Sequence, residues 1–143
     1  MKKILFLFLL AGLFYACKKD KIGTKPTLSF KGYSLDSVVA NTQVMFVTLD
    51  VRDGDGDIED TLQIAPLYDT KIQDTFYIVR RMPEIGANRG NSVKAEVAIR
   101  LDPVDFRTYQ SLNDSIHFLV FIRDNAGNIS DTLATPKIPY NIP

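Results

Sequence analysis

The sequence predicts an all-β protein, an antiparallel β-sandwich of about seven strands with one short helical crossover. Apolar residues alternate with polar ones over several segments, which is the period of a half-buried strand. Turn-forming residues separate these segments roughly every ten to fifteen residues, as in a sandwich or a barrel. The chain has 143 residues, 45% of them hydrophobic, which is enough for one domain around a core. A small closed barrel is the alternative.

Three segments carry the clearest alternation and predict the main strands. They are 45–53, 93–101 and 116–124. The third also has apolar side chains at Leu119 and Phe121, on the face opposite Phe118, which predicts a central strand with both faces covered. Weaker alternation predicts further strands at 28–33, 62–68, 75–82 and 129–138. Pro66 and Pro136 push their segments towards sheet edges or bulges, because proline has no backbone N–H to donate.

A short helix is predicted in the connection before the sixth strand. Asp102 suits the cap of a helix N-terminus, and Pro103 suits its first turn. Phe106, Tyr109 and Leu112 follow at a spacing of three, which predicts that one face of the helix packs on the sandwich. A helical crossover at this point is common in immunoglobulin-like sandwiches.

The first 26 residues are predicted to lie outside the sandwich. Lys2 and Lys3 precede an uncharged, mostly apolar run at 4–16, which matches a signal peptide and is too short for a good membrane-spanning helix. The run ends at Cys17, the only cysteine, and this arrangement resembles the lipobox of bacterial lipoproteins. The resemblance implies a signal peptide over 1–16, a lipidated Cys17 with a flexible tether over 17–26, and a sandwich domain over 27–143. An ordinary secretory signal with a chance cysteine is the alternative.

A lipid on Cys17 implies that the membrane is one partner of the protein. Several acyl chains hold a protein to a bilayer far better than one chain does. Some lipoproteins of the Bacteroidetes type carry a charged tract directly after the cysteine that directs export to the cell surface. Residues 18–21 are Lys-Lys-Asp-Lys, which is a more basic tract of this kind. We therefore expect a lipid-anchored outer-membrane protein, with the cell surface favoured over the periplasmic face.

Two segments of the chain repeat one another at a constant offset of 71 residues. Residues 51–62 and 122–133 are identical at seven of twelve positions. Asp53 and Asp124 suit Asx-type turns, and Gly56 and Gly127 suit a positive φ. The repeat therefore predicts two strand–turn–strand corners of the same chemistry, which an immunoglobulin-like order places side by side at one end of the sandwich.

The two corners also carry a family resemblance. Residues 53–58 read Asp-Gly-Asp-Gly-Asp-Ile, and residues 123–130 read Arg-Asp-Asn-Ala-Gly-Asn-Ile-Ser. This pair is similar to the signatures of small Bacteroidetes lipoproteins with an immunoglobulin-like or cadherin-like domain. The resemblance implies an immunoglobulin-like fold and a place in the cell envelope, and implies little about activity.

Acidic residues crowd the first corner and predict a calcium site. Asp53, Asp55 and Asp57 alternate with glycines that let the backbone turn tightly. Calcium takes about six to eight hard oxygen ligands, often from a flexible loop. The predicted ligands are Asp53, Asp55, Asp57, Asp60, Asp124, Asn125 and Asn128. An EF-hand is excluded, since Ile64 stands where its last glutamate would be. The alternative is a solvated turn whose acids only cap backbone groups.

Composition narrows the classes of function. Seventeen basic and seventeen acidic residues leave no excess charge for nucleic-acid binding. One histidine and one cysteine exclude a multi-histidine metal site and an intramolecular disulfide. We expect no catalytic residues, and a non-catalytic binding or structural module with an unknown protein or glycan partner. The alternative is an enzyme or enzyme accessory in polysaccharide use.

Overall fold

The computed structural model describes residues 23–71, 74–82, 90–109 and 111–143. The predicted signal peptide and Cys17 lie outside these residues. The strands are β1 (Thr27–Tyr33), β2 (Val38–Val39), β3 (Met45–Asp53), β4 (Thr61–Tyr68), β5 (Ile78–Arg81), β6 (Val93–Leu101), β7 (Leu112–Arg123), β8 (Leu133–Ala134) and β9 (Ile138–Ile142). The one helix in these residues is α2 (Pro103–Phe106), and it is too short to cross a membrane.

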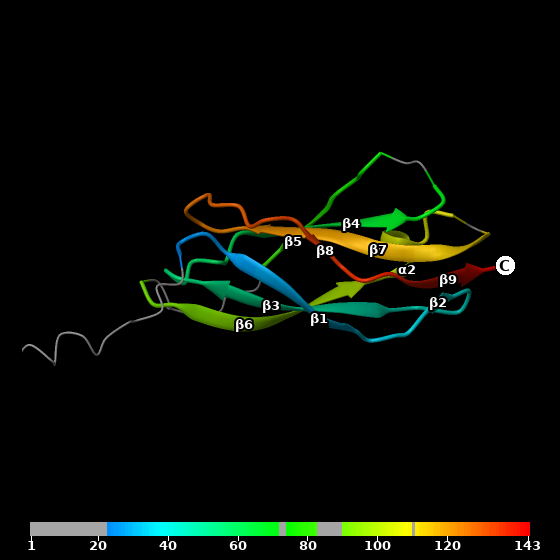
Figure 1. The fold of residues 1–143 in the computed structure, drawn as a ribbon, viewed down its shortest axis with the longest axis horizontal. Coiled ribbons are helices and arrows are strands. Elements are labelled where there is room, and N and C mark those ends of the chain that lie inside the picture. Colours follow the sequence, from blue (N-terminus) through cyan, green and yellow to red (C-terminus); the bar gives the residue numbers. More distant parts are fainter. Residues whose placement is uncertain (1–22, 72–73, 83–89, 110) are drawn as a thin grey trace, which may run out of the picture.

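The strands form two sheets that pack as two layers (Figure 1). The smaller sheet has the order β1-β3-β6, and the larger has the order β2-β9-β7-β4-β5 with β8 beside β7. All pairs are antiparallel except β2 with β9. The predicted all-β sandwich is therefore confirmed, with nine strands in the described residues where about seven were expected.

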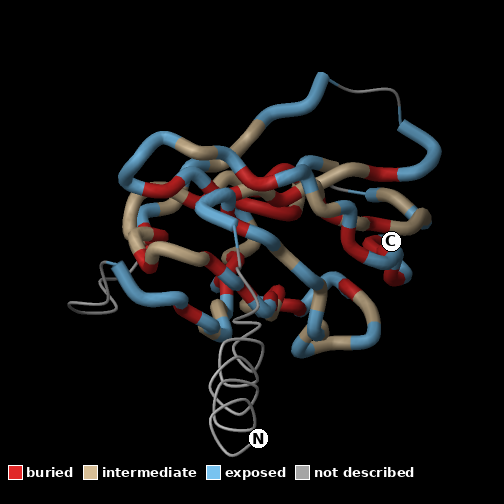
Figure 2. Tube along the Cα trace, turned by 60° about the vertical axis from the view of Figure 1, so that its left-hand side comes forward, coloured by how far each residue is buried: buried red, intermediate tan, exposed pale blue. Residues whose placement is uncertain are grey.

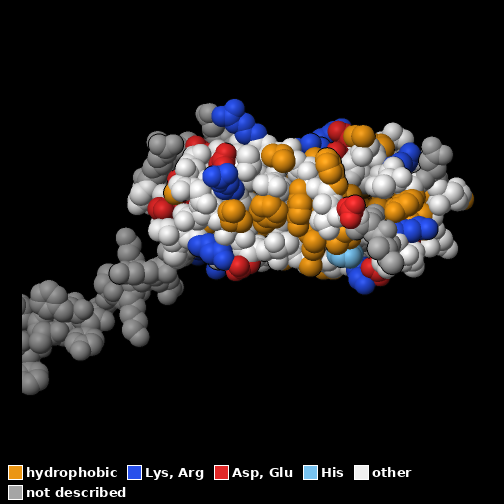
Figure 3. All heavy atoms as spheres, turned by 90° about the horizontal axis from the view of Figure 1, so that it is seen from above, with side chains coloured by type: hydrophobic (Ala, Val, Ile, Leu, Met, Phe, Trp, Pro, Cys, Tyr) orange, Lys and Arg blue, Asp and Glu red, His pale blue; other side chains and the backbone are white. Residues whose placement is uncertain are grey.

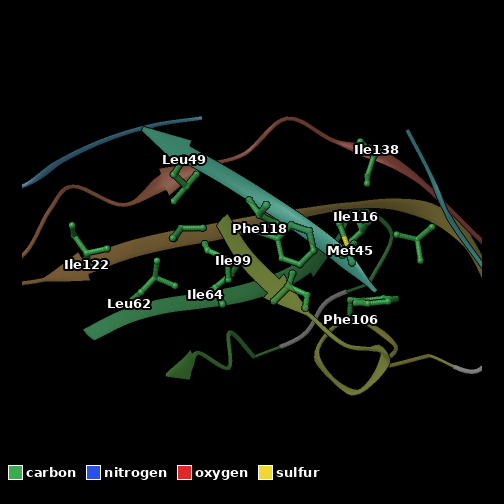
Figure 4. Close-up of a cluster of buried hydrophobic side chains, with 14 of the residues drawn as sticks. Met45, Leu49, Leu62, Ile64, Ile99, Phe106, Ile116, Phe118, Ile122 and Ile138 are labelled. Atoms are coloured by element: carbon green, nitrogen blue, oxygen red, sulfur yellow. The ribbon is translucent and has the colours of Figure 1, made fainter. Parts of the chain in front are cut away.

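Alternation along β3 and β7 builds the core. On β3 the side chains of Met45, Val47, Leu49 and Val51 are fully buried, and the residues between them are more exposed. On β7 of the other sheet, the alternate residues from Ile116 to Ile122, among them Phe118, are fully buried as well. Figure 2 shows buried stretches running through the middle of the domain, and Figure 4 shows side chains of both sheets meeting between the layers. The core therefore fills the space between the sheets.

Strand β7 is central, as its two apolar faces predict. It lies between β9 and β4, and Leu119 and Phe121 on its outer face are half-buried. The ring of Phe121 meets the ring of Tyr77 edge-on, with 5.0 Å between centroids. Figure 3 shows a band of hydrophobic side chains across the side of the domain on which the larger sheet lies. Pro66 lies on β4 beyond the residues that pair with β5, and on the other side it is aligned with Phe118 of β7.

The helix is shorter than predicted. It ends at Phe106, and the backbone N–H of Arg107 closes its single turn on the carbonyl of Pro103. Leu112, expected on the helix, already belongs to β7 and pairs with Ile142 of β9. The spacing of apolar residues was therefore misleading here, because a strand partner far along the chain competes with an isolated helical turn.

The C-terminal strand is also placed differently from the prediction of 129–138. Ile129 makes only an isolated bridge to Arg123, and β8 and β9 follow as separate strands. Pro136 lies between them, and the Thr135 hydroxyl accepts the N–H of Phe118 at 2.8 Å just before it. A side chain thus replaces a main-chain partner at the interruption. The short strand β2 was not predicted, and β5 begins three residues later than the expected 75.

Candidate calcium site

The end of β3 delivers a buried carboxylate into the first corner. Asp53 continues the inward-facing series of β3 and is fully buried. Its Oδ2 accepts the backbone N–H groups of Gly56 at 2.8 Å and Asp57 at 3.1 Å. Gly56 has φ +71°, a conformation that glycine adopts without strain. The predicted Asx-type turn is therefore present.

Three carboxylates converge in this corner. Asp53, Asp55 and Asp57 each offer an oxygen, and these oxygens lie within 4.8 Å of one another. The Oδ1 atoms of all three are buried and have no hydrogen-bond partner among the described residues. A buried anionic oxygen without a donor is costly, since the interior does not replace the water that it loses. Such a group of oxygens fits a hard cation.

The pKa values of two of these carboxyl groups reflect the crowding. Burial raises the pKa of Asp53, and the nearby carboxyl of Asp55 adds to the rise. Burial also raises the pKa of Asp57, and the negative charges of Asp124 and Asp55 add to it. Both shifts disfavour the ionised form, because burial and the neighbouring carboxyl groups both oppose ionisation. A bound cation would reverse this balance.

The second corner repeats the same turn but satisfies its aspartate. Asp124 is buried, and its Oδ1 accepts the backbone N–H of Asn128 at 2.7 Å. Its Oδ2 accepts the side-chain amide of Asn128 at 2.8 Å. In the first corner, the position equivalent to Asn128 is Asp57, which has no such amide. Asp53 therefore does not have the side-chain donor that Asn128 gives to Asp124.

The two corners lie side by side, as their repeat predicts. The backbone N–H of Asn125 donates to the carbonyl of Asp57 at 2.9 Å. A pocket of about 310 Å³ lies at the junction, lined by Asp55, Asp57, Gly90, Asn125 and Ala126. Its lining joins residues of both corners to one from the connection before β6. Asp55 and Asp57 therefore border a pocket that both corners share.

Gly90 is a part of the site that the sequence analysis missed. Its backbone N–H donates to the carbonyl of Asp55 at 2.6 Å, and its φ is +84°. The connection before β6 thus fixes the acidic corner from a third side. A lone glycine in a loop carries no sequence signal for such a contact.

The seven predicted ligands separate into three groups. Asp53, Asp55 and Asp57 converge, and Asn125 lines the adjoining pocket. Asp124 and Asn128 bond to each other, with Asp124 close enough to Asp57 to raise its pKa. Asp60 points elsewhere: its Oδ2 lies 3.8 Å from Nε of Arg123. Among the seven predicted ligands, Asp53, Asp55 and Asp57 are therefore the strongest candidates for holding a cation.

The predicted tether is attached to the same corners over its last residues. The carbonyl of Gly23 accepts the N–H of Gly54 at 3.1 Å, and the carbonyl of Thr24 accepts the Asn128 amide at 3.2 Å. Lys25 forms an ion pair with Asp131 at 2.6 Å. In Figure 1 the blue start of the described chain lies at the same end as the orange loop after β7, opposite the C-terminus. The chain thus enters the sandwich at the acidic end.

Comparisons with known proteins are sparse. No protein-family model matches the chain, and no curated protein sequence does either. A Niemann-Pick type C2 protein from the Japanese carpenter ant is similar in structure, with a TM-score of 0.44 and 12% sequence identity. The match covers 85% of this chain and 96% of that one. This likeness says nothing about the ligand or activity of the present protein.

Proposed function

We propose that the protein is a lipid-anchored lipoprotein of the bacterial outer membrane whose sandwich is a calcium-stabilised, non-catalytic binding or structural module. The observation that carries the calcium site is the buried, unpartnered Oδ1 of Asp53 beside those of Asp55 and Asp57. The anchor rests on the apolar run at 4–16 that ends at Cys17. The partner of the module is a protein or a glycan of the envelope.

Calcium would serve the fold by replacing missing donors. Asp53, Asp55 and Asp57 would hold the ion, and water from the open pocket would fill the remaining positions. The ion would neutralise the mutual repulsion of the three carboxylates. It would also strengthen the junction of the two corners, because Asp57 already accepts a hydrogen bond from Asn125.

The position of this site next to the tether suggests a role for calcium in holding the domain to its anchor. Gly23 and Thr24, at the end of the tether, bond to the two corners. A corner that loosens without calcium would loosen this attachment as well. The ion would therefore hold the domain firmly to its anchor, and the opposite end of the sandwich would be left for a partner.

Thermal unfolding with and without calcium tests the proposal. A soluble chain that begins at Lys18 includes every described strand and avoids the lipid. Its Tm is expected to rise with calcium and fall with chelator. Linkage stabilises the fold by about 2.7 kcal/mol when free calcium is about 100 times the Kd. Magnesium is expected to do less, because it demands stricter octahedral geometry.

Variants locate the response. Asp55→Asn with Asp57→Asn is expected to abolish the calcium effect, because two of the three converging carboxylates lose their charge. Asp36→Asn with Asp74→Asn is the matched control, since it removes two exposed acids away from the corners. A Tm that is unchanged between millimolar calcium and chelator would show that the acids only cap the turn.

A further inference from the structure

The sandwich is open along one side, between two strands that end different sheets. Strand β5 ends the larger sheet and β6 ends the smaller one, and the two do not pair. A cleft of about 360 Å³ lies between them. Ligand pockets in proteins span roughly 300–1,000 Å³, so this cleft has the size of a small-molecule site.

The floor of the cleft is aliphatic. Leu62, Met82, Val97 and Ile99 line it, and all four side chains are buried or half-buried. Figure 4 shows Leu62 and Ile99 in the space between the sheets. Such a floor favours a hydrocarbon chain, because contact removes apolar surface from water.

The cleft also carries a positive charge that faces inward. Arg80 lies opposite Leu62 in the register of β5 with β4, so it shares the inner face of the sheet. One of its terminal nitrogens lies 2.7 Å from Oδ1 of the buried Asp105. The other oxygen of that carboxylate, Oδ2, accepts the backbone N–H of Asp102 at 3.0 Å. A guanidinium has five N–H donors, so Arg80 keeps donors for a second anion.

Other charged groups around the cleft leave it positive. Arg81 and Arg100 line it with Arg80, and Arg100 is paired with Asp102 at 2.9 Å. Among the described residues, two aspartates therefore face three arginines, with one positive charge in excess. The occupant that complements this cleft has an apolar chain and an anionic head.

We propose that this cleft binds an aliphatic carboxylate, with the chain on the floor between the sheets and the carboxylate on Arg80. The planar guanidinium matches a carboxylate with two parallel N–H bonds. Water takes about 30 Å³ per molecule and a methylene is of similar size, so the cleft holds about twelve non-hydrogen atoms. Decanoate has this size. The inference goes beyond the calcium-stabilised module and does not depend on it.

Decanoate is therefore the probe, and amide NMR measures its binding to the chain that begins at Lys18. The buffer contains no calcium, and the decanoate concentration stays below that at which micelles form. Saturable shifts are expected on β5 and β6, away from the two corners. Decyltrimethylammonium has the same chain with a positive head, and it is expected to bind at least about tenfold more weakly, since it loses the charged hydrogen bonds. A failed calcium response in the melting assay would leave this measurement unaffected.

Three variants assign the contacts. Arg80→Met is expected to weaken the binding of decanoate by about tenfold or more. Arg52→Met removes an exposed arginine of β3 and is the control, which is expected to leave the affinity unchanged. Val97→Phe fills the cleft but keeps the Arg80 ion pair. It is expected to weaken the binding of both decanoate and decyltrimethylammonium. Equal binding of the two amphiphiles, or decanoate shifts that persist in folded Val97→Phe protein, would overturn the proposal.

Discussion

A single amide separates the two corners at the residue scale. Asn128 gives Asp124 the side-chain donor that Asp57 does not give to Asp53. Both turns share a backbone N–H that the fourth residue after the aspartate donates to its side chain. The aspartate of the second corner thus has hydrogen-bond donors on both oxygens, whereas Oδ1 of Asp53 has none among the described residues.

Asp57→Asn is therefore expected to raise the Tm of the protein in chelator. The new amide would occupy the place that Asn128 has in the second corner and would donate to Oδ1 of Asp53. It would also remove a carboxylate whose pKa is raised by burial and by the charge of Asp124. A hydrogen bond to a charged group contributes about 1.5–3 kcal/mol. Unfolding in denaturant with chelator measures the gain.

The same variant is expected to lose most of its calcium response. Asp36→Asn, at an exposed position, is the control for a simple change of charge. An Asp57→Asn protein that is less stable than wild type in chelator would show that the two corners are not equivalent. The repeat between residues 51–62 and 122–133 would then extend to sequence and turn shape, but not to the hydrogen bonding of the two aspartates.

At the scale of elements, the sequence predicted strands well where one face is buried. β3 and β6 begin and end where their alternation predicts, because each has a continuous core-facing row. Strand β7 starts earlier than its alternation, and β9 begins only at the end of the expected range, because their mutual pairing joins residues between about 20 and 30 positions apart. Local patterns carry no information about such partners.

The candidate site likewise has features that local sequence predicts and features that it does not. The convergence of Asp53, Asp55 and Asp57 follows from local spacing and was predicted. The engagement of Asp60 by Arg123 and the contact of Gly90 with Asp55 depend on the meeting of distant segments. These contacts were not predictable from the spacing of acids.

Gly127 tests how far the second corner depends on its turn. Its φ is +90°, which side chains rarely adopt, and an added Cβ would meet the Arg123 guanidinium at 3.7 Å. Gly127→Ala is expected to destabilise the fold by about 1–2 kcal/mol from the backbone alone. Gly32→Ala is the matched control, since an added Cβ there meets no atom within 4 Å. Equal denaturation midpoints for the two variants would contradict a strained corner.

For the whole molecule, the position of the tether orients the domain. The backbone N–H of Gly54 in the acidic corner donates to the carbonyl of Gly23, and Gly23 is the sixth residue after Cys17. An extended chain reaches at most about 3.3–3.6 Å per residue, so the corner would lie within about 20 Å of a lipid on Cys17. The calcium end would face the membrane, and the cleft between β5 and β6 would lie along the side of the domain.

Cys17→Ser is expected to move the protein from the membrane to the soluble fraction. The serine hydroxyl cannot carry the thioether-linked lipid, and no helix among the described residues is long enough to span a bilayer. Lys18→Ser, the same change one residue later, is the control and is expected to stay in the membrane. Fractionation followed by mass spectrometry measures both the location and the modification. Wild-type protein is expected to begin at Cys17 and to carry acyl chains, which supply the binding that one chain alone does not. A Cys17→Ser protein that stays in the membrane, beside a wild type that keeps residues 1–16 and has no acyl group, would show that the apolar run itself holds the protein there.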